Sequence, residues 1–170
     1  IAKVKRRMTL DYIHMVDPEQ AKGSASSIVR KALEKRREIA GNRLVSEQEL
    51  KALAPDLSKK IAINIRQTPK ARPTDRKVLK KAISIEYARP FFDQQGNVSR
   101  ILYGGRILNK NFDFIDQIAN AVFENKTYGS KPIGTVTIFL DDVRITTNVL
   151  DEKGQRAIGT RVSDIVYEKV

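Results

Sequence analysis

The stretch TVTIFLDDVRITTNV, from Thr135 to Val149, contains two runs of β-branched and apolar residues on either side of two aspartates. Such runs around a two-residue turn are typical of a β-hairpin. One face of this hairpin is then almost wholly aliphatic and is expected to pack against a helix. With Asp141 and Asp142 as the turn, the predicted cross-strand pairs are Leu140 with Val143, Phe139 with Arg144, Thr137 with Thr146, and Thr135 with Asn148.

The opposite face of the hairpin collects hydroxyls, an amide, a guanidinium and one aromatic ring, and two interpretations of it remain open. In the first, the face meets water, and its threonine and asparagine pairs are ordinary cross-strand pairs. In the second, it lines a cavity in which Arg144 binds the carboxylate of a small ligand. The candidate ligand-binding residues on this face are Thr135, Thr137, Arg144, Thr146 and Asn148.

Two long β-rich runs precede the hairpin. Residues 79–92 and 98–109 are predicted to form adjacent antiparallel strands that turn near Gly96, where a positive φ costs little. Asn111 is expected to cap a helix that runs through Glu124. The predicted buried stripe of that helix consists of Ile115, Ile118, Ala119, Val122 and Phe123.

The first part of the chain mixes short strands and helices, and Ser163 opens a last helix near the C-terminal end of the sequence. Strands that follow one another through tight turns favour an antiparallel sheet flanked by helices, an α/β chain of the α+β type. The patterns predict a strand over 10–17, a helix from Ser24 to Gly41, a short helix with a Ser46–Glu49 capping box that stops before Pro55, and a half-buried strand over 59–68.

The formal net charge of the chain is +12, which by itself suggests nucleic-acid binding. The whole excess of basic residues lies in residues 1–81, however, while ten of the eleven aromatic residues lie in residues 82–170. Proteins that bind single strands place stacking aromatics among their basic residues. A solvated basic face is therefore the favoured interpretation, and a basic RNA- or DNA-binding protein is the alternative function.

Side chains that support catalysis are scarce. The chain has no cysteine and a single histidine, which leaves few side chains from which to build a catalytic triad or a transition-metal site. The adjacent aspartates of the turn are expected to point apart into solvent. His14, in a predicted strand, and Tyr103, in the YGGRILN run, are weaker candidates for a second ligand pocket. We expect no enzyme activity, no cofactor and no bound metal.

At the level of longer motifs, GTVTIFLDDVRITTNV and the following DEKGQRAIGTRVSDIVYEKV resemble the Cache sensor modules of bacterial and archaeal receptors. In those modules a run of the form TIF…dvRi.TNv…G.RaiGTrvs..Vy..V recurs. The segments TPKARPTDRK and DQQGNVSRILYGGRILNKNFDFIDQIANAVF also resemble the part that precedes this run in double-Cache ectodomains. The chain departs from the family in having only QAKG between MVDPE and the next predicted helix, and in having no tryptophan.

The resemblance implies an extracytoplasmic sensor fragment of a histidine kinase or chemoreceptor, with membrane spans outside the fragment. It implies a first module over 1–109 and a connecting helix with a partial second module over 110–170. The expected partner is a small anionic or zwitterionic metabolite. We also expect a homodimer through an N-terminal helix and no binding to nucleic acid.

Overall fold

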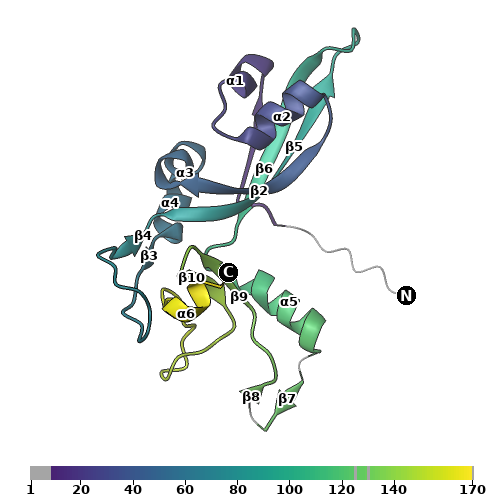
Figure 1. Ribbon diagram of the computed structural model, residues 1–170. Helices are drawn as coiled ribbons and strands as arrows, with labels where there is room; N and C mark the ends of the chain where they lie inside the picture. Colours follow the sequence, from purple (N-terminus) through teal and green to yellow (C-terminus); the bar gives the residue numbers. More distant parts are fainter. Residues whose placement is uncertain (1–8, 125, 130, 170) are drawn as a thin grey trace.

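The computed structural model describes residues 9–124, 126–129 and 131–169. The first part of the chain forms a four-stranded antiparallel sheet with helices packed on it (Figure 1). Its strands lie in the order β1-β6-β5-β2. Strands β5 and β6 turn at Gly96, whose φ is +81°, and this confirms the antiparallel pair predicted from the sequence. The strand bounds are β1 (Tyr12–Val16), β2 (Ile39–Ser46), β5 (Lys81–Phe92) and β6 (Val98–Ile107).

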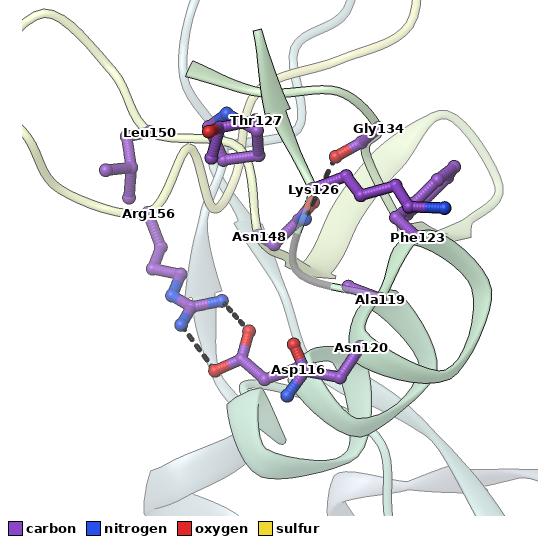
Figure 2. Close-up of a pocket in the computed structure, with 11 residues that line it drawn as sticks. Asp116, Ala119, Asn120, Phe123, Lys126, Thr127, Gly134, Asn148, Leu150 and Arg156 are labelled. Carbon is purple, nitrogen blue, oxygen red and sulfur yellow. Dashed lines mark hydrogen bonds and ion pairs between the residues drawn. The ribbon is translucent and has the colours of Figure 1, made fainter. Parts of the chain in front are cut away.

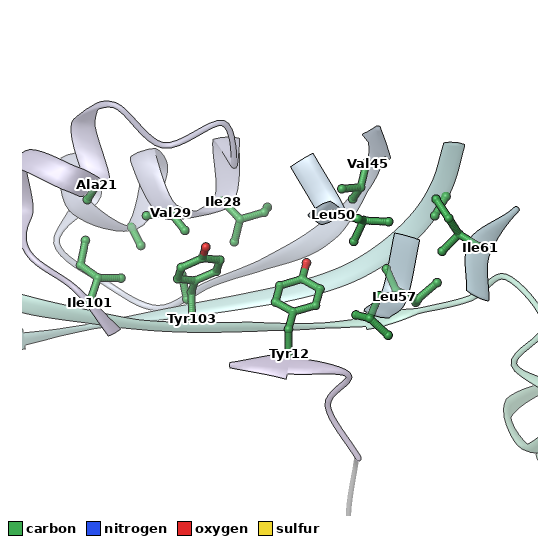
Figure 3. Close-up of a cluster of buried hydrophobic side chains, with 14 residues drawn as sticks. Tyr12, Ala21, Ile28, Val29, Val45, Leu50, Leu57, Ile61, Ile101 and Tyr103 are labelled. Atoms are coloured by element: carbon green, nitrogen blue, oxygen red, sulfur yellow. The ribbon is translucent and has the colours of Figure 1, made fainter. Parts of the chain in front are cut away.

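Four short helices cover one face of this sheet and enclose the main hydrophobic core, which includes Val29, Leu50 and Ile101 (Figure 3). The capping box predicted at Ser46 is present, because Ser46 and Glu49 exchange hydrogen bonds with each other's backbone N–H groups. Caps of this kind satisfy backbone donors that a helix start leaves unpaired. The helices are α1 (Pro18–Lys22), α2 (Ser27–Lys35), α3 (Glu47–Leu53) and α4 (Pro55–Ile61).

A second core lies beyond the end of β6, around the hairpin formed by β9 (Thr137–Leu140) and β10 (Val143–Thr147). Val143 and Ile145 are fully buried there, as the aliphatic face predicted. Helix α5 (Phe112–Phe123) begins at the predicted cap Asn111 and ends at the predicted Glu124. The remaining elements are β3 (Ile63–Asn64), β4 (Val78–Leu79), β7 (Thr127–Tyr128), β8 (Lys131–Pro132) and α6 (Asp164–Tyr167), the last opened by Ser163 as predicted.

Two of the predicted elements are wrong in part. The helix expected from Ser24 to Gly41 is capped by Ser26 instead and ends at Lys35, and β2 already begins at Ile39. Arg36 stops the helix because it adopts a left-handed conformation with φ of +53°. The strand expected over 59–68 is mostly helix and loop, because only Ile63–Asn64 pairs, with β4.

The predicted buried stripe of α5 is fully buried only at its start, while Ile118, Ala119 and Phe123 are half-buried. Ile115 is fully buried, whereas Val122, near the other end of the helix, is 63% exposed. The C-terminal half of α5 therefore packs against less protein than its amphipathic pattern implied, and it faces the cavity described below. Within the described residues, no helix is long and apolar enough to cross a membrane, and no cluster of His, Cys, Asp and Glu is arranged to hold a metal ion.

Candidate functional site

A β-bulge changes the hairpin pairing that the sequence predicted. Val143 pairs with Leu140 and Arg144 with Phe139, as expected, but the register then shifts between Arg144 and Thr146. The prediction that Thr137 faces Thr146 is wrong, because Thr137 pairs with Thr147. The prediction that Thr135 faces Asn148 is also wrong: the Asn148 backbone N–H donates to Val136 O at 3.2 Å, and the Asn148 side chain accepts from Val136 N–H at 2.8 Å.

The bulge moves Thr146 from the predicted polar face into the core. Thr146 is fully buried, and its hydroxyl donates to the backbone carbonyl of Asn111 at 3.2 Å, which ties β10 to the start of α5. Thr147 takes its place beside Thr137, with the two hydroxyl oxygens 2.6 Å apart. Bulges re-aim side chains in this way because one strand carries an extra residue. The residues on this face are therefore Thr137, Phe139, Arg144 and Thr147, of which Thr147 is itself fully buried.

Arg144 keeps its predicted place opposite Phe139, with the guanidinium carbon 5.4 Å from the ring centroid. One terminal nitrogen donates to the Thr160 hydroxyl at 2.9 Å, while the buried Nε has no hydrogen-bond partner. No carboxylate of the described residues pairs with this guanidinium. Burial without such a partner lowers the pKa of Arg144, since the charged form loses hydration.

Asn148 is the residue of the predicted set that lines a cavity of about 330 Å³ between α5 and the segments on either side of the hairpin (Figure 2). Its amide donates to the Gly134 carbonyl at 3.3 Å and so holds the rim of the cavity in place. The lining is completed by apolar and polar side chains in alternation: Asp116, Ala119, Asn120, Phe123, Lys126, Thr127, Pro132, Leu150 and Arg156.

Charge in this cavity comes from Lys126 at one end and from the pair of Asp116 and Arg156 at the other (Figure 2). The Arg156 guanidinium binds Asp116 through two hydrogen bonds of 2.8 and 2.7 Å and also donates to Thr147 O. The hydrogen bond that Arg156 donates to Asp116 raises the pKa of Arg156. Among the described residues, Lys126 forms an ion pair only with Glu124, at 2.8 Å and with both side chains well exposed, so this contact is weak. The cavity therefore carries one net positive charge.

All the residues that line this cavity lie within one segment of the sequence that matches a known family. Residues 106–170, which contain α5, the hairpin and α6, match the family model for single cache domain 3. This match supports a Cache-type sensor domain over residues 106–170. No curated protein and no solved structure shows significant similarity to the chain.

The Cache assignment confirms the resemblance that the hairpin motif indicated. The α+β fold, with helices on one face of a four-stranded antiparallel sheet, is consistent with the PAS-like fold of Cache modules. Cache domains are sensor modules, typically extracytoplasmic and generally non-catalytic. The division into modules at 109, the homodimer and the flanking membrane spans stay predictions.

Upstream of the Cache match, the two weaker candidates do lie together. The rings of His14 and Tyr103 stack with centroids 5.4 Å apart, on neighbouring strands β1 and β6. Tyr103 lines a second cavity of about 330 Å³ between the sheet and the helices, whereas His14 is not among its lining residues. Burial raises the pKa of Tyr103. The Nε2 atom of His14 is buried without a hydrogen-bond partner.

The same cavity is bordered by a buried polar network that the sequence did not indicate. Glu86 is 1% exposed and accepts hydrogen bonds from Tyr12 at 2.5 Å, from Ser26 at 2.6 Å and from Arg43 at 2.8 Å. Burial, followed by the hydrogen bond to Glu86, raises the pKa of Tyr12. Glu86 occupies a position of β5 that strand alternation predicts to be buried. Because an acidic residue is rarely buried without partners, its presence there is the sequence signal that could have revealed the network.

The prediction that both aspartates of the turn point into solvent is wrong for one of them. Asp141 is exposed, as predicted, but Asp142 is 1% exposed and is bound by two arginines. Arg161 Nε donates to it at 2.6 Å and Arg76 at 2.7 Å, and the Arg161 side chain is itself only 2% exposed. The turn therefore attaches the 68–77 loop to the hairpin, and it adds an ion pair to the backbone hydrogen bonds that join the C-terminal segment to Arg144. Sequence spacing could not show this, because the partners lie 66 and 19 residues away.

Proposed function

We propose that this chain is the ligand-binding sensor part of a transmembrane signal-transduction receptor, either a histidine kinase or a chemoreceptor. Its ligand is a small anionic or zwitterionic metabolite. The observation that carries the proposal is the cavity of Figure 2, which lies in the Cache segment and combines one net positive charge with amide and apolar walls. Small-molecule sites in proteins are concave and mostly apolar, with a few polar groups that fix orientation.

The charges of the cavity determine which ligands it favours. The ion pair of Lys126 with Glu124 is exposed and weak, so a ligand carboxylate can take the place of Glu124 at little cost. The Asp116 carboxylate at the other end is already bound by Arg156 and favours a ligand ammonium through its remaining lone pairs. Phe123 and Leu150 then contact the carbon skeleton. An amino acid or a short organic acid meets these requirements.

Arg144 supplies a second positive group on the polar face of the hairpin. A half-buried guanidinium without a carboxylate partner favours an anion, because a carboxylate restores the electrostatic stabilisation that burial removes. Arg144 does not line the cavity of Figure 2, so the two positions are separable by mutation. This separation allows the ligand position to be tested directly.

The test is a thermal-shift screen of amino acids and organic acids, followed by calorimetry on the compounds that raise the melting temperature. We expect Lys126→Ala to weaken binding of the best compound by about tenfold or more, through loss of a charged partner. Lys153→Ala, an exposed lysine in the 151–155 turn, is the matched control and leaves binding unchanged.

Arg144→Ala identifies which of the two positions binds the carboxylate. If the ligand reaches the hairpin face instead, this variant weakens binding by about 2–4 kcal/mol, while Lys126→Ala has no effect. A carboxylate that shifts wild type and both variants equally would show that neither position binds it. In that case the proposed site is wrong.

A further inference from the structure

The tip of the β5–β6 hairpin projects beyond α2, at the end of the molecule farthest from the β9–β10 hairpin (Figure 1). Pairing of β5 with β2 ends at Ala88, opposite Ile39, while pairing with β6 continues to Phe92. Residues 89–92 therefore have a paired side and an open side. The open side borders a depression of about 470 Å³ lined by Arg37, Glu38, Arg89, Pro90, Phe91 and Phe92.

Two adjacent phenylalanines are exposed at this tip. Phe91 is 40% exposed and Phe92 is 46% exposed, and a β-bulge lies between them. An arginine lies over each ring: Arg89 is 5.7 Å from the Phe91 centroid, and Arg36 is 5.5 Å from that of Phe92. Arg36 also donates a hydrogen bond to the Gly96 carbonyl in the turn. The rings are thus held in place before any partner arrives.

The surroundings of the rings are strongly positive. Arg36, Arg37 and Arg100 are exposed, and none of them forms an ion pair with a carboxylate of the described residues. Of the two acids nearby, Asp93 accepts hydrogen bonds from its own turn, and Glu38 pairs with Arg89 at 3.3 Å. The fold has brought Arg36, from the first half of the sequence, onto Phe92 of the second half.

We propose that this tip is a docking surface for an extended acidic segment of another protein. Arginine and aromatic side chains are enriched among the residues that contribute most to protein interfaces, and here they lie together with a mixed-charge rim. Pro90 has no N–H to donate to an added strand, so side chains hold the segment here: its carboxylates meet the arginines and its apolar side chains contact the two rings. The proposal does not depend on the sensor function.

Two other classes of partner fit the tip less well. A membrane would meet the polar turn 93–97 first, and both phenylalanines lie behind this turn. Nucleic-acid bases need open ring faces to stack on, but a guanidinium covers one face of each ring, and Glu38 lines the depression. A protein segment with alternating carboxylates and apolar side chains avoids both conflicts.

The test is fluorescence anisotropy with a short labelled peptide in which glutamates alternate with valine and phenylalanine. We expect saturable binding that weakens with salt, and a loss of about tenfold or more in both Phe91→Ser and Phe92→Ser. Both rings are already half exposed, so these variants should keep the wild-type melting temperature. Tyr128→Ser removes an aromatic that is 87% exposed on β7, away from the tip, and serves as the matched control.

The same proteins are then tested with vesicles of phosphatidylcholine and phosphatidylglycerol, and with labelled oligothymidine. Tighter binding to either one, lost in the two phenylalanine variants, would assign the tip to a membrane or to a single strand and overturn the proposal. Absence of saturable peptide binding by the wild type overturns it as well, as does equal peptide binding by Tyr128→Ser and the tip variants.

Discussion

Asp142 provides a sharp test of what holds the hairpin to the rest of the chain. Its carboxylate is 1% exposed and binds Arg161, whose side chain is 2% exposed, together with Arg76 at 2.7 Å. In Asp142→Asn the shape is kept but the negative charge is lost, so the buried Arg161 guanidinium has no compensating charge. Breaking a buried pair in this way costs about 3–5 kcal/mol, and we expect the free energy of unfolding to fall by that amount.

The neighbouring residue offers a matched control, because Asp141→Asn makes the same chemical change at an exposed position. Asp141 has a φ of +58°, which asparagine also tolerates, and its side chain is 40% exposed where it pairs with Arg76. We expect this variant to cost at most about 1 kcal/mol. Urea unfolding, monitored by far-UV circular dichroism, gives the free energy of unfolding of both variants and of the wild type.

A third variant separates the loss of charge from the loss of packing. Asp142→Leu combined with Arg161→Met replaces the ion pair by apolar side chains, and it should be less destabilised than Asp142→Asn because no charge is left buried. If Asp142→Asn costs no more than Asp141→Asn, then the buried ion pair does not attach the C-terminal segment, and the reasoning is refuted.

The remaining predictions concern two glycines and one acid. At Gly159, where φ is +80°, an added Cβ would lie 2.1 Å from Asn64 O, so Gly159→Ala should lower the free energy of unfolding by about 2–5 kcal/mol. Gly154→Ala, at φ of +73° with open space around it, should lower the free energy of unfolding by only about 1–2 kcal/mol. Equal urea midpoints for the two alanine variants would contradict this difference. Burial raises the pKa of Glu49, but hydrogen bonds from Ser46 and Arg43 outweigh it and hold the pKa below its ordinary value. Glu49 therefore stabilises the fold above about pH 4.3, and this is lost on acidification; Glu49→Gln should flatten the decline in melting temperature between about pH 5 and pH 3.

The sequence by itself determined those features that depend on neighbouring residues. The Ser46 capping box, the Asn111 cap and the β5–β6 turn at Gly96 follow from contacts within a few positions, and all were predicted. The aliphatic face of the hairpin was likewise correct at Val143 and Ile145. A long, specific motif carried the Cache assignment, which the match to residues 106–170 confirms.

The tertiary structure decided which side chains share a face and which charges are buried. Because of the bulge after Arg144, the Thr146 hydroxyl donates to the backbone carbonyl of Asn111. These two residues are 35 positions apart, so strand alternation could not predict their contact. The chain also brings Arg76 and Arg161 together on Asp142, and Arg36 onto Phe92. Local patterns fix the period of an element, but register, burial and ion pairing depend on which distant segments pack against it. For this reason the fold class could be predicted from the sequence, while the cavity of Figure 2 and the basic aromatic tip could be found only in the folded chain.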